Sequence, residues 1–257
     1  MLLVIDVGNT NITLGAFAGD RLRATWRIAT DVHKTPDEYT ALLRVMLPPS
    51  GVKLEEVSDI ILASVVPPLQ RTMVHVCEQC FGQRPVVVEA GIRTGIKIVY
   101  EQPREVGADR IANAVGAVKR YGGPAIVVDF GTATTFDAVS ADGDYVGGAI
   151  APGIVIATEA LFAHAAKLPR IDLVRPKSVI GRNTVAAMQA GIIYGYAGLV
   201  DGLVERIKRE LGGQAAVIAT GGLAEIIAPE SSTITVVDHE LTLHGLYYLY
   251  QLNRPAA

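Results

Sequence analysis

The sequence predicts an α/β fold made of two related domains that face one another across a cleft. The first observation is a repeat, because residues 2–13 (LLVIDVGNTNIT) and 125–136 (AIVVDFGTATTF) follow one pattern. Each copy has an apolar run that ends in an aspartate, one spacer and a glycine, followed by small hydroxyl or amide side chains. The second observation is a further match between residues 61–69 and 217–226. The third is the composition, with 50% hydrophobic residues and 26 glycines, which is typical of a compact enzyme core with many tight turns.

In the first half, the pattern predicts strands over residues 2–6, 12–17 and 21–29, the last two joined by a polar turn at 18–20. A helix is expected from Thr35 to about residue 47, because Thr35 can cap it, Pro36 fits its first position and Glu38 completes a capping box. Strands are expected at 59–63 and 85–88. A helix over residues 105–121 then leads into the second domain.

The second half repeats this plan. We expect strands over residues 126–129, 135–140 and 145–150, with a turn at 141–144, and later a strand and glycine turn near residue 217. A long helix is expected from Asn183 onward, and its second part, residues 201–211, is amphipathic. The division that follows is an N-terminal domain of residues 1–118 and a C-terminal domain of residues 119–257.

The repeated glycine turn suits the binding of a phosphorylated ligand. Glycine adopts backbone angles that other residues avoid, so the turn can present N–H groups and hydroxyls to an anion. The aspartates at the strand ends, Asp6 and Asp129, can hold a cation or its water shell. A single copy is equally well explained as a hairpin opening with a turn-favouring aspartate. Two copies favour a pair of turns that grip one nucleoside triphosphate with its metal ion.

Charge and hydropathy exclude several classes of protein. The net charge of −3 and the pI of about 6.0 leave no broad basic surface for nucleic acid, so a small ligand is expected. The N-terminal residues lack a basic leader, which indicates a cytoplasmic protein. Residues 183–200 carry no charge, but they contain Asn183, Thr184, Gln189 and three glycines, so we expect a buried helix and no membrane span. The P-loop, GxGxxG, HExxH and GxSxG motifs are absent from the sequence.

Two further features have a plain structural explanation beside a functional one. Cys77 and Cys80 lie late in an expected helix that ends near Gly82, where the helix dipole disfavours a thiolate, and we expect inert reduced thiols. The long helix carries glycines on one face, which implies a close packing partner; this partner is either another helix of the same chain or a second copy of the protein. These glycines are Gly191, Gly195, Gly198 and Gly202.

Three motifs then carry a resemblance to a known family. They are Asp6-Val7-Gly8-Asn9-Thr10, Gly107-Ala108-Asp109-Arg110 and the run from Asp129 to Thr135, DFGTATT. In these positions the chain resembles the type III pantothenate kinases, which belong to the superfamily of acetate and sugar kinases, heat-shock chaperones and actin. The similarity continues nearly to the end of the chain, through Gly147-Gly148, Lys167-Leu168-Pro169-Arg170, Asn183-Thr184 and Ala219-Thr220-Gly221-Gly222.

The resemblance implies ATP-dependent phosphorylation of pantothenate to 4'-phosphopantothenate, the first step of coenzyme A biosynthesis. It also implies two ribonuclease-H-like domains, a homodimer, Mg²⁺ with the nucleotide, and a monovalent cation, K⁺ or NH₄⁺. Asp109 is the implied catalytic residue, either as the base for the substrate hydroxyl or as the group that orients it.

The remaining site residues are also implied by the resemblance. The first turn is expected to bind the ATP phosphates, with Asp6 near Mg²⁺, and Thr132 is expected to make a further contact with ATP. The residues of the first turn are Asp6, Val7, Gly8, Asn9, Thr10, Asn11, Ile12 and Thr13. Asp129 is the expected ligand of the monovalent cation. Pantothenate is expected to contact Tyr100, Gly107, Ala108, Asp109, Arg110 and Thr184. Each of two residues also has a purely structural explanation. Tyr100 can be a half-buried aromatic residue of a strand, and Thr184 can be the cap of a helix.

Two other functions stay open from the sequence alone. The first is a kinase or phosphatase of the same superfamily that acts on another small hydroxylated substrate, because only the acceptor pocket would differ. The second is a nucleotide-gated regulatory accessory protein, although the presence of Asp109 beside both turns favours catalysis.

Overall fold

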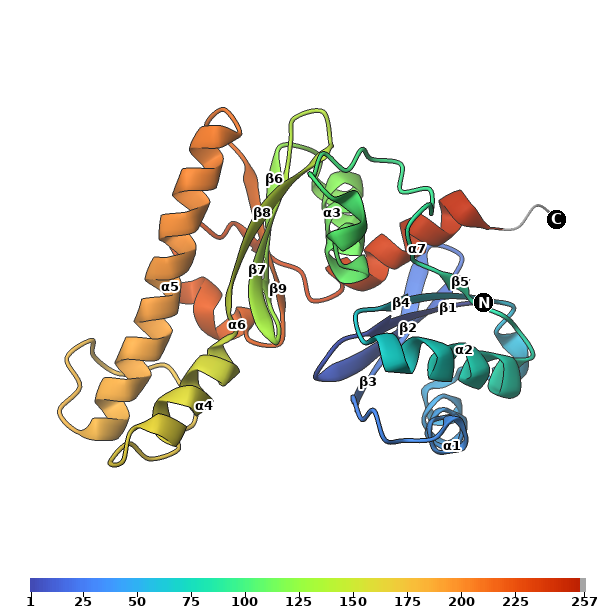
Figure 1. The fold of residues 1–257 in the computed structure, drawn as a ribbon, viewed down its shortest axis with the longest axis horizontal. Helices are drawn as coiled ribbons and strands as arrows, with labels where there is room; N and C mark the ends of the chain where they lie inside the picture. Colours follow the sequence, from blue (N-terminus) through green and yellow to red (C-terminus); the bar gives the residue numbers. More distant parts are fainter. Residues whose placement is uncertain (255–257) are drawn as a thin grey trace. The chain divides into compact units, whose positions relative to one another are not determined.

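The computed structural model describes residues 1–254 and confirms an α/β fold with two compact units, each built on a five-stranded mixed sheet (Figure 1). The first unit contains residues 1–97, 101–119 and 241–254. The second contains residues 98–100 and 120–240. No helix among the described residues is long and apolar enough to cross a membrane.

The sheet of the first unit has the order β3-β2-β1-β4-β5, in which β1 runs antiparallel to β2 and parallel to β4. Its strands are β1 (Leu2–Val7), β2 (Asn11–Ala18), β3 (Arg21–Ala29), β4 (Asp59–Ser64) and β5 (Val86–Val87). Helices α1 (Pro36–Met46) and α2 (Pro67–Phe81) pack on the face that carries Leu3 and Ile5. Helices α3 (Ala108–Tyr121) and α7 (Leu241–Asn253) pack on the other face, against Leu2 and Val4. Short 3₁₀ turns lie at Pro48–Ser50, Leu54–Glu56 and Pro103–Glu105.

Local signals explain where two of these helices begin. The capping box of α1 is present as predicted, because Glu38 N donates to Thr35 Oγ1 (3.4 Å) and Thr35 N donates to Glu38 Oε2 (2.8 Å). Helix α3 begins at Ala108, later than the expected residue 105, since Pro103–Glu105 forms a separate 3₁₀ turn before it. Asp109 nevertheless lies in the first turn of α3.

The second unit repeats the topology, with the sheet order β10-β9-β6-β7-β8. Its strands are β6 (Ala125–Phe130), β7 (Ala133–Val139), β8 (Tyr145–Pro152), β9 (Ala216–Gly221) and β10 (Val236–Val237). The α-helices are α4 (Ile154–His164), α5 (Thr184–Glu210) and α6 (Ala224–Ile227), and a 3₁₀ turn follows at Ala228–Glu230. Ile126, Val128 and Phe136 form its core with residues of α5 and α6.

The two glycine turns are similar but not equal in length. Asp6 pairs with Thr13 across the first hairpin, whereas Asp129 pairs with Thr135 across the second. The second turn is therefore one residue shorter, and the sequence match of residues 2–13 with 125–136 slips by one position after the glycine.

Helix α7 belongs to the first unit, whereas the division expected from the sequence assigned it to residues 119–257. Thr242 Oγ1 donates to Asn113 Oδ1 at 2.6 Å, and the bare backbone of Gly245 lies directly against the carbonyl of Ala112. The helix also buries Leu246 and Leu249 against β1 and β4. Such long-range packing leaves no local sequence signal, which explains the difference.

In the second unit, Asp201 of α5 fastens the loop at residues 231–233. Its carboxylate accepts hydrogen bonds from Ser231 Oγ (2.6 Å), from Ser232 N (2.9 Å) and Oγ (2.7 Å), and from Thr233 Oγ1 (2.8 Å). Partial burial raises the pKa of Asp201, but these hydrogen bonds outweigh it and lower the pKa to about 2.

We predict that Asp201→Asn destabilises the protein by about 1 to 2 kcal/mol at pH 7, because an amide cannot accept all of these bonds and partial solvent screening limits the loss. The folded-state pKa is lower than the ordinary value of 3.8, so the stabilisation is present at neutral pH and is lost as pH falls toward about 2. Urea unfolding at pH 7 and pH 3 measures this, and the difference between wild type and variant should be smaller at the lower pH. Asp142→Asn, at an exposed turn, is the matched control; equal stability of the Asp201 variant at pH 7 would contradict the prediction.

Candidate functional site

The first glycine turn connects β1 and β2 and exposes Asn9, Thr10 and Asn11. Gly8 N donates to Asn11 O at 3.0 Å, which closes the turn. A side chain at Gly8 would lie 3.0 Å from that same carbonyl oxygen, so the glycine permits the tight closure. Asp6, half-buried at the end of β1, precedes the turn directly.

Thr30, just after β3, holds this turn from behind. Its Oγ1 donates to Gly8 O at 2.6 Å and its N donates to Thr10 O at 3.0 Å. With these carbonyls facing Thr30, the turn is fixed in one shape with its polar residues at the surface. Thr30 was not predicted from the sequence, where the available signal was a hydroxyl residue directly after Ala29, the partner of Asn11 in the strand pairing.

The Gly107–Arg110 turn lies at the same edge of the first sheet. Val65, which follows β4, donates its N–H to Val7 O at 3.0 Å and so lies beside the first turn. A side chain at Gly107 would reach Val65 Cγ1 at 3.5 Å. Within the first unit, the structure therefore brings the two predicted motifs to the neighbouring ends of β1 and β4.

Asp109 folds its carboxylate back over Gly107. A Cβ at Gly107 would lie 2.5 Å from Asp109 Oδ1, so only glycine leaves room for it. The same oxygen accepts from Arg110 N at 2.8 Å. Burial raises the pKa of Asp109, although the backbone N–H and the charge of Arg110 oppose the shift. A carboxylate with a raised pKa accepts a proton more readily than one with an ordinary pKa of about 3.9.

In the second unit, Asp129 occupies the equivalent position at the end of β6. Gly131 N donates to Ala133 O at 3.0 Å and closes the second turn, which carries Thr132. Gly221 has a φ of 89°, and a Cβ there would lie 2.6 Å from Asp129 Oδ1. The carboxylate thus lies against bare backbone at the end of β9. Gly153 packs in the same way against the carbonyl of Thr132.

The donor atoms are suited to hard cations held together with a ligand. Among residues 1–254, no group of three or more His, Cys, Asp or Glu side chains is placed to hold a metal ion. Mg²⁺ commonly binds through one or two carboxylates together with substrate phosphates, which fits the single Asp6 beside an exposed turn. A carboxylate next to unshielded backbone, as at Asp129 and Gly221, offers the oxygen ligands that a cation such as K⁺ takes.

Tyr100 and Thr184 lie at separate places on the second unit. Tyr100 is 39% exposed and rests beside Tyr145 at the start of β8. Thr184 lines a groove that also includes Pro152, at the other end of β8. At about 3.3 Å per residue, strand β8 separates these ends by more than 20 Å. Asn183 caps α5 by accepting from Ala186 N at 2.8 Å, so the hydroxyl of Thr184 is not needed as the cap.

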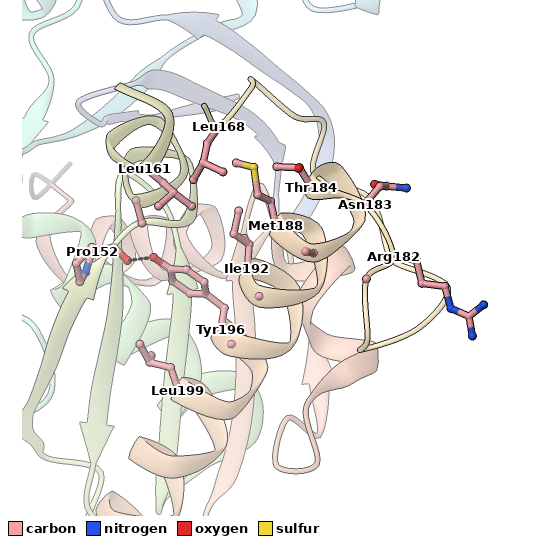
Figure 2. A pocket seen from close by; sticks show the side chains of 15 residues that line it. Pro152, Leu161, Leu168, Arg182, Asn183, Thr184, Met188, Ile192, Tyr196 and Leu199 are labelled. Atoms are coloured by element: carbon pink, nitrogen blue, oxygen red, sulfur yellow. Dashed lines mark hydrogen bonds between the residues drawn. The ribbon is translucent and has the colours of Figure 1, made fainter. Parts of the chain in front are cut away.

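The groove between α4, the loop before α5 and α5 is large and mainly apolar, with a volume of about 1010 Å³. Figure 2 shows Leu161, Leu168, Met188 and Ile192 gathered on its walls, while Arg182 points away from them. The glycine face of α5 lies here, and a Cβ at Gly191, Gly195 or Gly198 would meet no described atom within 4 Å. Packing inside the chain therefore does not explain these glycines.

The two cysteines are structural. Cys77 and Cys80 are free and buried in α2, which ends at Gly82 as predicted. Burial raises the pKa of Cys77 to about 12, so this thiol stays protonated near neutral pH.

Comparison with known proteins gives a consistent result. The family model described as "Type III pantothenate kinase" matches residues 2–206. A type III pantothenate kinase of Moorella thermoacetica is 57% identical over 253 residues, which cover 98% of this chain and 100% of the relative. Among solved structures, one described as a conserved Baf family transcriptional activator of Campylobacter jejuni aligns with a TM-score of 0.63 and 19% identity, covering 98% of each chain. Component A of an Acidaminococcus fermentans (R)-2-hydroxyglutaryl-CoA dehydratase aligns with a TM-score of 0.59 and 14% identity, covering 98% of this chain and 99% of that one. These structures share the fold.

We predict that Thr30→Val lowers stability by about 1 kcal/mol, the usual worth of one hydrogen bond, and weakens nucleotide binding several-fold because the turn loses its support. Calorimetric titration with a non-hydrolysable ATP analogue measures the affinity. Thr94→Val is the matched control, since Thr94 Oγ1 also donates to a backbone carbonyl, Ile96 O, at 2.6 Å in the same unit. The control should lose similar stability and keep its nucleotide affinity; equal affinities in both variants would remove Thr30 from the site.

Proposed function

The chain belongs to the type III pantothenate kinase family and phosphorylates pantothenate with ATP in coenzyme A biosynthesis, and from this premise we propose which of its residues do so. The observation that carries the proposal is the arrangement in the first unit. There the Asp109 turn and the first glycine turn share one edge of the sheet, linked through Val65. Phosphoryl transfer needs alignment, charge neutralisation and a group to receive or orient the hydroxyl proton.

Asp109 acts on the primary hydroxyl of pantothenate. Its burial supports a role as the base, because a desolvated carboxylate with a raised pKa is a better proton acceptor. In a loose transition state the hydroxyl loses its proton late, and Asp109 then orients it by a hydrogen bond until that point. Gly107 leaves room for the carboxylate, and the N–H of Arg110 orients it, for either role.

The first turn binds the ATP phosphates through backbone N–H groups and the side chains of Asn9 and Thr10, and Asp6 contacts the water shell of Mg²⁺. When bound, the metal ion neutralises charge on the phosphates. The exposure of this turn and its fixation by Thr30 support the assignment. The residues proposed for this site are Asp6, Val7, Gly8, Asn9, Thr10, Asn11, Ile12 and Thr13.

In the second unit, Asp129 binds the monovalent cation, K⁺ or NH₄⁺, and Thr132 contacts ATP. The support is the carboxylate that lies against the bare backbone of Gly221. A monovalent cation there offsets negative charge near a substrate that is itself an anion.

Pantothenate contacts Tyr100, the turn from Gly107 to Arg110, and Thr184, with Arg110 as the positive charge for its carboxylate. Because β8 separates Tyr100 from Thr184 within one chain, we assign Thr184 to the pocket of the partner subunit in a homodimer. The open glycine face of α5 and the apolar groove beside it supply the dimer contact. The cytoplasmic location expected from the sequence stays a prediction.

We predict that Asp109→Asn abolishes most turnover and leaves pantothenate binding largely intact, since the amide neither accepts the proton nor orients the hydroxyl in the same way. Mass spectrometry with ATP, Mg²⁺ and K⁺, with and without pantothenate, should detect phosphopantothenate for the wild type only when pantothenate is present. Asp20→Asn, at an exposed turn of the same unit, is the control and should keep full activity. A near-normal kcat for the Asp109 variant would overturn both proposed roles.

The same variant should be more stable than the wild type at neutral pH. The folded-state pKa of Asp109 is raised, so the stabilisation by its protonated form is present at low pH and is lost as pH rises through that pKa. The wild type then carries the cost of a buried charge, which the variant lacks. Urea unfolding at pH 7 should show a higher midpoint for Asp109→Asn, and the difference should shrink toward pH 3.

We predict that Gly195→Leu converts the dimer to a monomer, because the Cβ meets no described atom of the rest of its own chain within 4 Å and the leucine fills the proposed contact. Light scattering measures the mass, and the KM for pantothenate should rise as the partner's Thr184 is lost from the pocket. His75→Leu, at an exposed position of α2, is the control and should remain dimeric. A monomer with unchanged kinetics would show that each chain forms its pocket alone.

A further inference from the structure

Two polar side chains, Asp137 and Tyr145, are completely buried in the second unit. Tyr145 donates its phenol O–H to Asp137 Oδ1 at 3.1 Å. A carboxylate without solvent exposure is costly unless hydrogen bonds satisfy it, and apolar residues commonly fill such places at no loss of stability. Packing alone therefore does not explain why this place in the core holds a carboxylate and a phenol.

An irregularity in the sheet brings the two side chains together. The pairing of β7 with β8 shifts between Ala138 and Val139, so that Val139 faces Tyr145 while Ala138 faces Gly147. Asp137 itself pairs with Gly148. A bulge of this kind redirects the side chains around it, and here it brings the phenol of Tyr145 to the carboxylate two positions before the shift.

Tyr145 in turn holds the short segment that carries Tyr100. Ile98 forms a parallel bridge with Tyr145, and Val99 N donates to Tyr145 O at 2.8 Å. The rings of Tyr100 and Tyr145 lie with their centroids 6.2 Å apart. Each residue of the segment thus contacts Tyr145.

Tyr100 also packs against the bare backbone of Gly147. Its φ is 115°, and a Cβ at this position would lie 3.6 Å from Cδ2 and Cε2 of the Tyr100 ring. Residues 97 and 101, on either side of the segment, group with the first unit, so only residues 98–100 are fixed to the second. The orientation of Tyr145 consequently sets the position of Tyr100.

We infer that Asp137 and Tyr145 are positioning residues for pantothenate: Asp137 fixes the phenol of Tyr145, and Tyr145 fixes Tyr100, whose ring and hydroxyl contact the substrate. The inference rests on the proposed role of Tyr100. It assigns the two buried groups to acceptor binding, and it separates them from ATP binding and from proton transfer.

Tyr145→Phe tests this with the loss of a single oxygen atom. The Kd and KM for pantothenate should rise about five- to tenfold, as expected for the loss of one hydrogen bond that acts through Tyr100. The kcat at saturating pantothenate and the KM for ATP should stay within about twofold, since neither group touches the reacting atoms. A role in stability alone would lower the unfolding temperature without this separation of kinetic constants.

Tyr121→Phe is the matched control. Tyr121 also donates its phenol O–H to a buried carboxylate, Asp238 Oδ2, at 2.8 Å in the same unit. It should lose similar stability and keep its KM for pantothenate. Val99→Pro, at a residue that is 56% exposed, removes the N–H donated to Tyr145 O without a change in the buried pair, and it should also raise the KM for pantothenate.

Tyr100→Ala, alone and combined with Tyr145→Phe, distinguishes the outcomes. If Tyr145 acts through Tyr100, the double variant binds pantothenate no more weakly than Tyr100→Ala. Additive effects, or a normal Kd for Tyr145→Phe beside a weakened Tyr100→Ala, would overturn the inference and leave the proposed function intact. A normal Kd for Tyr100→Ala would overturn the role of Tyr100 and the inference with it, while product formation by the wild type reports on the kinase activity separately.

Discussion

The close approach of a carboxylate to glycine backbone is the constraint on which the predicted site residues of each unit depend. Asp109 lies over Gly107 in the first unit, and Asp129 lies against Gly221 in the second. At either glycine a methyl group would occupy the space of the carboxylate oxygen. Each acid thus depends on a missing side chain for its position, and each lies against backbone peptide groups.

Burial makes the Asp109 carboxylate a better proton acceptor but lowers the stability of the fold. A solvated aspartate would be easier to accommodate but would be a poorer proton acceptor for an alcohol. The first turn of α3 moderates the cost, because the N–H of Arg110 bonds the carboxylate and the helix N-terminus favours negative charge. Stability and activity are therefore opposed at this single residue.

Local patterns predicted most strands and the turns between them, because apolar runs, glycines and the capping box at Thr35 act over a few residues. The start of α3 was predicted too early, since the sequence did not distinguish a 3₁₀ turn at Pro103 from the first turn of a helix. Thr30 and Asp137 were missed for another reason. Their contacts depend on which residues face each other across paired strands. The shift in pairing between β7 and β8 beside Tyr145 has no signal in the amino-acid sequence. Asp6, Asp109 and Asp129 could be singled out because their motifs are contiguous in the chain, and their roles stay predictions.

The packing of α7 on the first sheet has a consequence for how the molecule is made. Leu2, Val4 and Ile61 precede the second unit in the chain, yet their cover includes Leu243 and Leu246, which follow it. If folding proceeds as the chain is synthesised, this face of the N-terminal sheet stays partly uncovered until the residues after the second unit have been made. The first sheet is then completed only when residues 241–253 pack on it, after the second unit has been made.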